Sequence, residues 1–301
     1  MQATTTKILD ERRFPVSLTE TITPIRELYD CGKQERWNPE VDILWKTLDL
    51  GKYDADILEA ARLTWSRRAW VEYAGLCETP ALLVRLCLEL GREADPKYFL
   101  TVRNTEEAWQ IDCYHRYAQA LGGYVDSSPL AATEKIFNQY RHRHVLDAEQ
   151  NVDVLFAVYS VAEDGLELAL FEAYLAGTTE PVAKQILTKS VKAKQRNVSF
   201  AWLYMTKRAA QWSPEQCVAV GSGVHSYLQD IELNGYHCAW LGDPQGQEAQ
   251  AADITAKAGL GAVTQATEAV VFKTYITQLR EDLRNIGIPL AELTHPELGT
   301  L

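Results

Sequence analysis

Apolar residues recur every three or four positions through most of the chain after residue 50, and strict alternation of apolar and polar residues is nearly absent. This spacing places apolar side chains on one face of a helix and predicts an all-α fold. Prolines and glycines interrupt the pattern and set the expected helix ends. The predicted helices span residues 54–91, 95–122, 129–145, 149–177, 180–212, 214–240 and 247–285.

The segments between these helices are short, and one of them carries a clear helix-start signal. Ser213, Pro214 and Gln216 have the order of a capping box with proline at the first helical position. Long helices joined by short loops predict an up-and-down bundle, and no change in composition marks a second domain. We expect an N-terminal arm with a short helix (1–50), one helical domain (51–290) and a C-terminal tail (291–301).

Composition narrows the functional classes. The 301 residues include 41 acidic and 30 basic side chains, and the resulting charge of −11 argues against nucleic acid as a partner. The most apolar long stretch, 152–177, contains five acidic residues, so we expect no membrane span. The N-terminus lacks the basic-then-apolar order of a secretory signal, and the six cysteines form no C-x-x-C pair. These features predict a cytoplasmic protein with reduced thiols.

Several ionisable residues stand where the helical pattern predicts a buried, apolar face. Glu78 and Asp164 each have apolar neighbours three, four and seven positions away. Glu163 is an alternative to Asp164 as the inward carboxylate. Asp112 and His115 lie three positions apart, which sets a carboxylate beside an imidazole one turn away. An inward carboxylate costs several kcal/mol unless it is protonated, paired or bound to a metal. We therefore expect a polar site inside the bundle.

A carboxylate, a carboxylate-x-x-His and a third carboxylate on successive helices are most of what a di-iron or di-manganese bundle needs. The fourth helix departs from that pattern. Residues 181–213 contain five lysines and two arginines but no Asp, Glu or His. Lys194 has Leu187, Val191 and Ala201 on its own stripe, so its side chain is predicted to point inward.

Four motifs, in order, resemble those of the ferritin-like di-iron carboxylate family, in the branch of ribonucleotide reductase small subunits and related oxygenases. They are GLCETPALL, QIDCYHRYAQAL, AEDGLELALF and VKAKQRNVSFAWLYM, and LYDCGKQERWNPEVDILW resembles the segment that precedes them. The resemblance covers roughly residues 27–210. It implies a ferritin-like bundle that activates oxygen with a metal centre and takes electrons from a partner reductase or a reduced cofactor.

The resemblance also assigns positions to individual residues. Glu78 takes the first ligand position, Asp112 and His115 take the second motif, and Asp164 or Glu163 takes the third. In the fourth motif, Lys194 stands where a bridging glutamate is expected and Asn197 where a histidine is expected.

Two kinds of centre are compatible with this pattern. One iron or manganese ion could be held by Glu78, Asp112 and His115, with Lys194 and Asn197 as polar groups of the site. Alternatively, the centre is metal-free, and the Lys194 ammonium supplies the positive charge among the carboxylates. His225, on a glycine-rich helical face, is either a replacement ligand or a core histidine.

Three functions follow from these alternatives. The first is an oxidoreductase of the oxygenase class that acts on a small organic substrate. The second is a non-catalytic scaffold resembling the β-subunits of bacterial multicomponent monooxygenases, which would contact a catalytic partner subunit. The third is a metal-free lyase or isomerase that uses Lys194 as a base. An enclosed pocket around Lys194 would favour an enzyme, whereas an exposed apolar surface would favour a scaffold. A homodimer is expected from the habit of the family.

Overall fold

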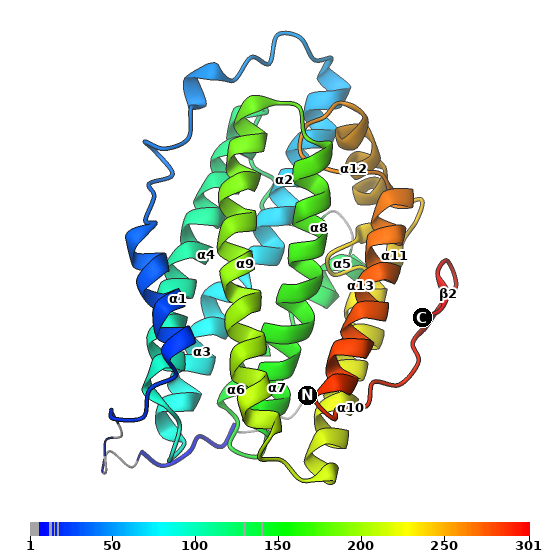
Figure 1. Ribbon diagram of the computed structural model, residues 1–301. Coiled ribbons are helices and arrows are strands. Elements are labelled where there is room, and N and C mark those ends of the chain that lie inside the picture. Colours follow the sequence, from blue (N-terminus) through cyan, green and yellow to red (C-terminus); the bar gives the residue numbers. More distant parts are fainter. Residues whose placement is uncertain (1–5, 12–13, 15, 17, 129–130, 140) are drawn as a thin grey trace.

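The computed structural model describes residues 6–11, 14, 16, 18–128, 131–139 and 141–301, and within them the chain is an all-α bundle, as predicted (Figure 1). Parts of the predicted arm (1–5, 12–13, 15 and 17) and of the predicted helix 129–145 (129–130 and 140) lie outside the described residues. The helices are α1 (Thr23–Gln34), α2 (Ala55–Tyr73), α3 (Gly75–Leu88), α4 (Ala94–Ala120), α5 (Ala131–Phe137), α6 (Arg141–Leu146), α7 (Val152–Phe156), the π-helix η2 (Ala157–Glu163), α8 (Asp164–Gly177), α9 (Pro181–Ala209), α10 (Pro214–Asp230), α11 (Ala239–Gly242), α12 (Gln247–Lys257) and α13 (Gln265–Asn285).

The centre of the bundle is formed by α2 with α3, α4, the run from α7 to α8, and α9. Helix α4 packs against α2, α3 and α9, and α8 packs against α9 (Figure 1). Outside this group, α12 covers α2, α13 covers α8, and α1 lies across α4 and α9. Long antiparallel helices bury one apolar stripe each, and here the stripes meet in one continuous core that includes Trp65, Phe99, Tyr114 and Phe200.

The N-terminal arm is fastened to the bundle by both apolar and polar contacts. Ile25, Trp37 and Ile43 join the main core. At the start of α1 the Ile22 amide donates to Asp95 with a distance of 2.6 Å, and Arg26 pairs with the same carboxylate at 2.6 Å. The two-residue strands β1 (Thr294–His295) and β2 (Gly299–Thr300) form an antiparallel ribbon near the C-terminus, and η1 (Trp45–Thr47) and η3 (Glu232–Asn234) are 3₁₀ turns. No helix in the described ranges is long and apolar enough to span a bilayer.

The capping box predicted at Ser213 and Gln216 is present at the start of α10, but several predicted helices are divided. The predicted helix 54–91 is broken between α2 and α3, where Gly75 faces α4 so closely that a Cβ would lie 2.9 Å from the Glu107 carboxyl carbon. The predicted helix 214–240 ends instead at Asp230.

The predicted helix 247–285 is also divided, because a loop separates α12 from α13. Gly259 and Gly261 have φ values of +71° and +101°, which a continuing helix cannot contain. The loop is held against α2, since Trp65 Nε1 donates to the Leu260 carbonyl at 2.8 Å and Arg68 Nη2 donates to that of Gly261 at 2.6 Å. Periodicity alone did not indicate this break.

The predicted helix 149–177 carries a π-helical segment, η2, in its middle. A π turn leaves backbone carbonyls without their usual intrahelical donors. The Tyr275 hydroxyl on α13 donates to two of them, at 3.1 Å to Val161 and 2.7 Å to Ala162. Gly165 permits this approach, because a Cβ there would lie 2.5 Å from the tyrosine oxygen. The π segment ends where the acidic residues of the bundle centre begin.

Candidate functional site

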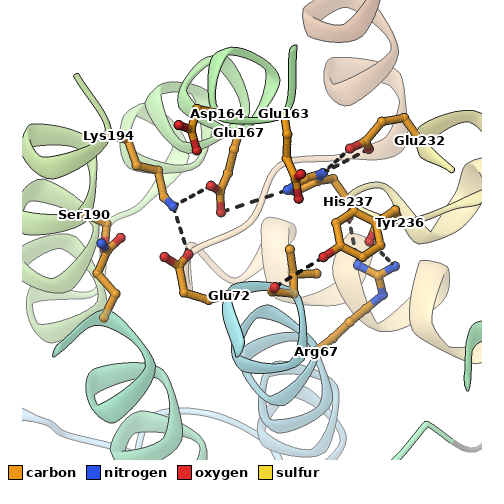
Figure 2. A network of polar contacts seen from close by, with 12 residues as sticks. Arg67, Glu72, Glu163, Asp164, Glu167, Ser190, Lys194, Glu232, Tyr236 and His237 are labelled. Carbon is orange, nitrogen blue, oxygen red and sulfur yellow. Dashed lines mark hydrogen bonds and ion pairs between the residues drawn. The ribbon is translucent and has the colours of Figure 1, made fainter. Parts of the chain in front are cut away.

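Three buried cations lie at the bundle centre, each between carboxylates of different helices. The first is Lys194 on α9, whose side chain is 3% exposed. Its Nζ atom is 2.8 Å from Glu72 Oε2 on α2 and 2.6 Å from Glu167 Oε2 on α8 (Figure 2). The Phe171 ring lies 4.8 Å from the same ammonium. Lys194 therefore joins three helices through one charge.

The second cation, Arg103 on α4, also pairs with two carboxylates. Its Nε atom donates to Glu107 Oε1 at 2.8 Å, and its Nη1 atom pairs with Asp164 Oδ2 at 2.7 Å. Nη1 also donates to Ser160 Oγ, 3.1 Å away in the π-helical segment. The Thr79 hydroxyl on α3 donates to Glu107 at 2.8 Å. Arg103 thereby connects α4 to the acidic end of η2.

The third cation, Arg141 on α6, lies between Glu78 and Glu163. Its Nε atom is 2.8 Å from Glu78 Oε1, and its Nη2 atom donates both to Glu78 Oε2, at 2.8 Å, and to Glu163 Oε2. The guanidinium also lies 4.6 Å from the centre of the Tyr159 ring. All three cations are buried, so these are interior ion pairs rather than surface ones.

The centre holds more carboxylates than cations. Its six acidic side chains are Glu72, Glu78, Glu107, Glu163, Asp164 and Glu167. Three cations balance only three of these six carboxylates, so burial favours proton uptake by some of the acidic groups. We refer to these nine side chains together as the ion-pair network.

The excess of carboxylates and their burial are reflected in the pKa values of the acidic groups. Burial raises the pKa of Glu163 and of Asp164 to about 7, against the opposing effects of Arg141 and Arg103 respectively. Burial and the neighbouring charge of Glu167 raise the pKa of Glu72 well above its ordinary value. For Lys194, burial favours the neutral amine, but Glu167 and Glu72 outweigh it, so its pKa is raised and it remains an ammonium.

His237 extends the network away from α9. Its Nδ1 atom is 2.8 Å from Glu232, and its Nε2 atom is 4.0 Å from Glu167 (Figure 2). Burial lowers the pKa of an imidazole, but the hydrogen-bonded carboxylate of Glu232 outweighs it and the pKa of His237 is raised. The protonated ring is therefore favoured.

A cavity of about 30 Å³ lies inside the network. At the ~10–15 Å³ that one buried water requires, it holds about two waters and no organic substrate. Asn197 lines it, and its side-chain oxygen has no hydrogen-bond partner. Small polar ligands of water size are all that this space admits as it stands.

Five residues predicted from the sequence meet at this cavity. They are Glu78, Glu163, Asp164, Lys194 and Asn197. The sequence left open whether Asp164 or Glu163 is the site residue of the third motif. Both line the cavity, together with Glu167, at the end of the π-helical segment.

The inward orientation predicted for Asp112 and His115 is wrong. Asp112 is 40% exposed and pairs with Arg116 at 2.9 Å, and the exposed His115 ring packs on Tyr124. They lie on the outer face of α4, so the metal site predicted from Glu78, Asp112 and His115 is not formed. The face that turns inward carries Arg103, Glu106, Glu107 and Gln110.

Sequence reasoning also missed Glu72, Arg103, Glu107, Arg141 and His237. A signal for two of them was available, because Arg103 and Glu107 have the four-residue spacing of a helical ion pair. Glu72 lies one residue before the end of α2. Arg141 and His237 lie in segments too short for helical periodicity to predict which way their side chains point. His225 does not line the cavity, and its Nε2 atom donates to the Glu292 carbonyl, 3.1 Å away.

The donors at the centre do not fit a dimetal cofactor. A di-iron or di-manganese centre needs carboxylates and imidazoles converging on open positions. Here, the carboxylates converge on Lys194, Arg103 and Arg141 instead. Within the described ranges, no group of three or more His, Cys, Asp or Glu side chains is arranged to hold a metal ion.

No protein-family model and no curated protein matches the chain by sequence. Solved structures do match it over most of their length. A variant of an R2-like ligand-binding oxidase with a non-activated Mn/Mn cofactor shares 16% identity, with a TM-score of 0.60 and coverage of 89% of this chain and 98% of that one.

Two further variants of an R2-like ligand-binding oxidase, with Mn/Fe cofactors, give TM-scores of 0.58 and 0.53 at 15% identity. They cover 87% and 88% of this chain and 92% and 91% of theirs. Identity at this level establishes architecture and leaves activity open. The chain thus has the ferritin-like helical fold of the R2-like oxidases, which confirms at the level of the fold the resemblance found in its sequence.

Proposed function

We propose that this chain is a non-catalytic helical subunit of an oxidase or oxygenase system, in which the ion-pair network takes the place of a metal centre. The observation that carries the proposal is the position of the Lys194 ammonium, bound to Glu72 and Glu167 at 2.8 and 2.6 Å in the bundle core. The solved structures with the same fold are oxidases, which supports an oxidase-type ferritin-like protein at a coarse level.

The geometry of the network supports a structural role in two ways. The 30 Å³ cavity leaves no room for an organic substrate beside Lys194. The raised pKa of Lys194 keeps its amine protonated, which disfavours the lyase or isomerase alternative in which this residue acts as a base.

Exposed apolar side chains on the N-terminal arm support the scaffold role. Among the described residues, large apolar side chains are exposed along it at Ile8, Phe14, Val16, Leu18, Val41 and Leu44. Phe14 is 79% exposed. Exposed apolar side chains gathered on one segment are typical of an interaction surface. We infer that the arm contacts the partner subunit.

An oxidoreductase with an altered centre is the second candidate, and the surplus of carboxylates favours it. Two acidic groups with pKa values near 7 line a cavity of about 30 Å³, which is large enough for water. Such groups exchange protons near neutral pH, as an active centre requires. An iron or manganese cofactor would require Lys194 and Arg103 to leave the positions they occupy.

The partner role can be tested by isolating the tagged chain from its native cells at its natural level. We expect an equimolar ferritin-like subunit that contains iron or manganese, identified by mass spectrometry. Phe14→Ser with Leu18→Ser should abolish the association without unfolding the chain, because both side chains are exposed. Val218→Ser, an exposed apolar residue on α10, is the matched control.

The catalytic candidate is tested on the isolated chain. Ferrous iron or Mn²⁺ is added anaerobically, oxygen is admitted, and oxygen uptake is followed. The scaffold proposal predicts uptake no faster than that of the same metal in buffer. Repeated turnover that depends on the chain would overturn the proposal in favour of the oxidoreductase. The homodimer proposed from the sequence is tested separately, by sedimentation equilibrium.

A further inference from the structure

A second cavity, of about 50 Å³, adjoins the ion-pair network between α2, α8 and the segments from His237 to α13. Val71, Glu167 and His237 line both cavities. Its volume is several times the ~10–15 Å³ that one water requires. Thr64 and Ala252 on its lining are only partly buried, so the cavity approaches the surface between α2 and α12.

Arg68 lines this cavity as a buried cation without an anionic partner. It is 8% exposed, and its Nη2 atom donates to the Gly261 carbonyl at 2.6 Å. Its Nη1 atom has no hydrogen-bond partner, and no described carboxylate lies within the 4.0 Å of an ion pair. Aromatic rings surround the guanidinium at 4.3 Å (Trp65), 4.9 Å (Tyr174), 5.3 Å (Phe171) and 5.9 Å (Tyr114).

The aromatic rings stabilise the charge but cannot accept the Nη1 hydrogens in the way an anion does. An arginine stays charged in proteins even where burial lowers its pKa, as it does for Arg68. A buried donor without a hydrogen-bond partner costs free energy, and a ligand that accepts its hydrogen would remove that cost.

His237 offers a second donor to the same space. Its Nδ1 atom is occupied by Glu232, while its Nε2 atom has no hydrogen-bond partner. In the protonated ring Nε2 carries a hydrogen. Arg68 and His237 thus present two N–H groups without a hydrogen-bond partner, from α2 and from the loop before α11, with Glu167 4.0 Å from His237 Nε2.

Each carboxylate on the lining is hydrogen-bonded to another group, and none of them is hydrogen-bonded to Arg68 Nη1 or His237 Nε2. Glu167 pairs with Lys194 at 2.6 Å, Glu248 pairs with Arg67 at 2.9 Å, and Glu268 accepts from Tyr174 and Trp240 at 2.8 Å each.

We propose that this cavity binds a small monovalent anion, either a halide or a carboxylate of one or two carbons, between Arg68 Nη1 and His237 Nε2. The anion accepts one charge-assisted hydrogen bond from each donor and neutralises the unpaired guanidinium. The small volume and the aromatic rings exclude larger anions. The site stands independently of the proposed partner role, because it requires no second protein.

Binding is tested on the full chain by calorimetric titration with sodium formate, acetate, chloride or bromide, at constant ionic strength maintained with gluconate, which is too large for the cavity. Saturable binding of formate or a halide is expected. Arg68→Lys retains the charge but removes the Nη1 donor, and it should weaken the affinity roughly tenfold to a hundredfold, the loss typical of a charged hydrogen bond. His237→Gln should weaken it as well. Arg92→Lys, a buried arginine fully paired with Glu89 and Asp153, is the control and should leave the affinity unchanged.

Crystals of the wild-type chain soaked in bromide provide a readout that does not depend on any variant folding. An anomalous peak within hydrogen-bond distance of Arg68 Nη1 supports the site. Absence of that peak, or binding equally strong in wild type and Arg68→Lys, overturns the proposal. Acetate binding without formate or halide binding would also overturn it, because the smaller anions fit wherever acetate does.

Discussion

Replacing Lys194 with methionine tests the energetic role of the ion-pair network. Methionine fills a similar volume but carries no charge, so the Glu167 carboxylate would remain buried without its 2.6 Å partner. Burial raises the pKa of Glu167, and Lys194 is the main group that lowers it again, so in the variant Glu167 either keeps a buried charge without that partner or takes up a proton, as Glu72 does more readily. Breaking a buried pair in this way costs about 3–5 kcal/mol of unfolding free energy.

The free energy of unfolding should be measured by urea denaturation of Lys194→Met and of Lys192→Met. Lys192 lies on the same helix, but its side chain is 56% exposed and pairs with Glu35 at the surface. Its loss should cost no more than about 1 kcal/mol. Equal costs for the two variants would refute the view that the central lysine carries a structural charge.

Three further outcomes follow from the same structure. Glu163, whose pKa is raised from 4.5 to about 7, binds its proton more tightly in the folded chain than in the unfolded one, so its contribution to stability is present below pH 4.5 and lost as pH rises through about 7. Relative to Glu163→Gln, the wild type should lose up to about 3 kcal/mol between about pH 5 and about pH 8, and a difference independent of pH would contradict this. Tyr275→Phe removes the donor of the Val161 and Ala162 carbonyls and should cost about 1–3 kcal/mol in urea denaturation, whereas Tyr73→Phe, at the surface, should cost little. Dialysis against a chelator should leave the thermal midpoint unchanged, and a marked fall would reveal a structural metal.

The fold could be predicted because helical periodicity is a local signal that long helices repeat many times. The same signal located Lys194 on an inward stripe, as found. Helical periodicity did not predict the helix breaks at Gly75 and Gly261. These glycines closely approach Glu107 and Trp65, and such tertiary contacts leave no local pattern in the sequence.

The error on α4 has a different origin. Both faces of that helix carry charged residues, so its polar pattern does not distinguish inside from outside. The Asp112–His115 spacing resembles a known motif, whereas Arg103 and Glu107 on the other face have only the spacing of a helical ion pair. The inward face is set by packing against α2, α3 and α9. The residue pattern of one helix does not contain this information.

We infer that ion pairs, rather than a metal cofactor, occupy the core of this bundle. The most direct measurement is the metal content per chain, by mass spectrometry, of protein purified from cells supplemented with iron and manganese. We expect that neither metal is bound in stoichiometric amount, because Lys194, Arg103 and Arg141 already pair with the carboxylates. One or two tightly bound ions per chain would contradict it.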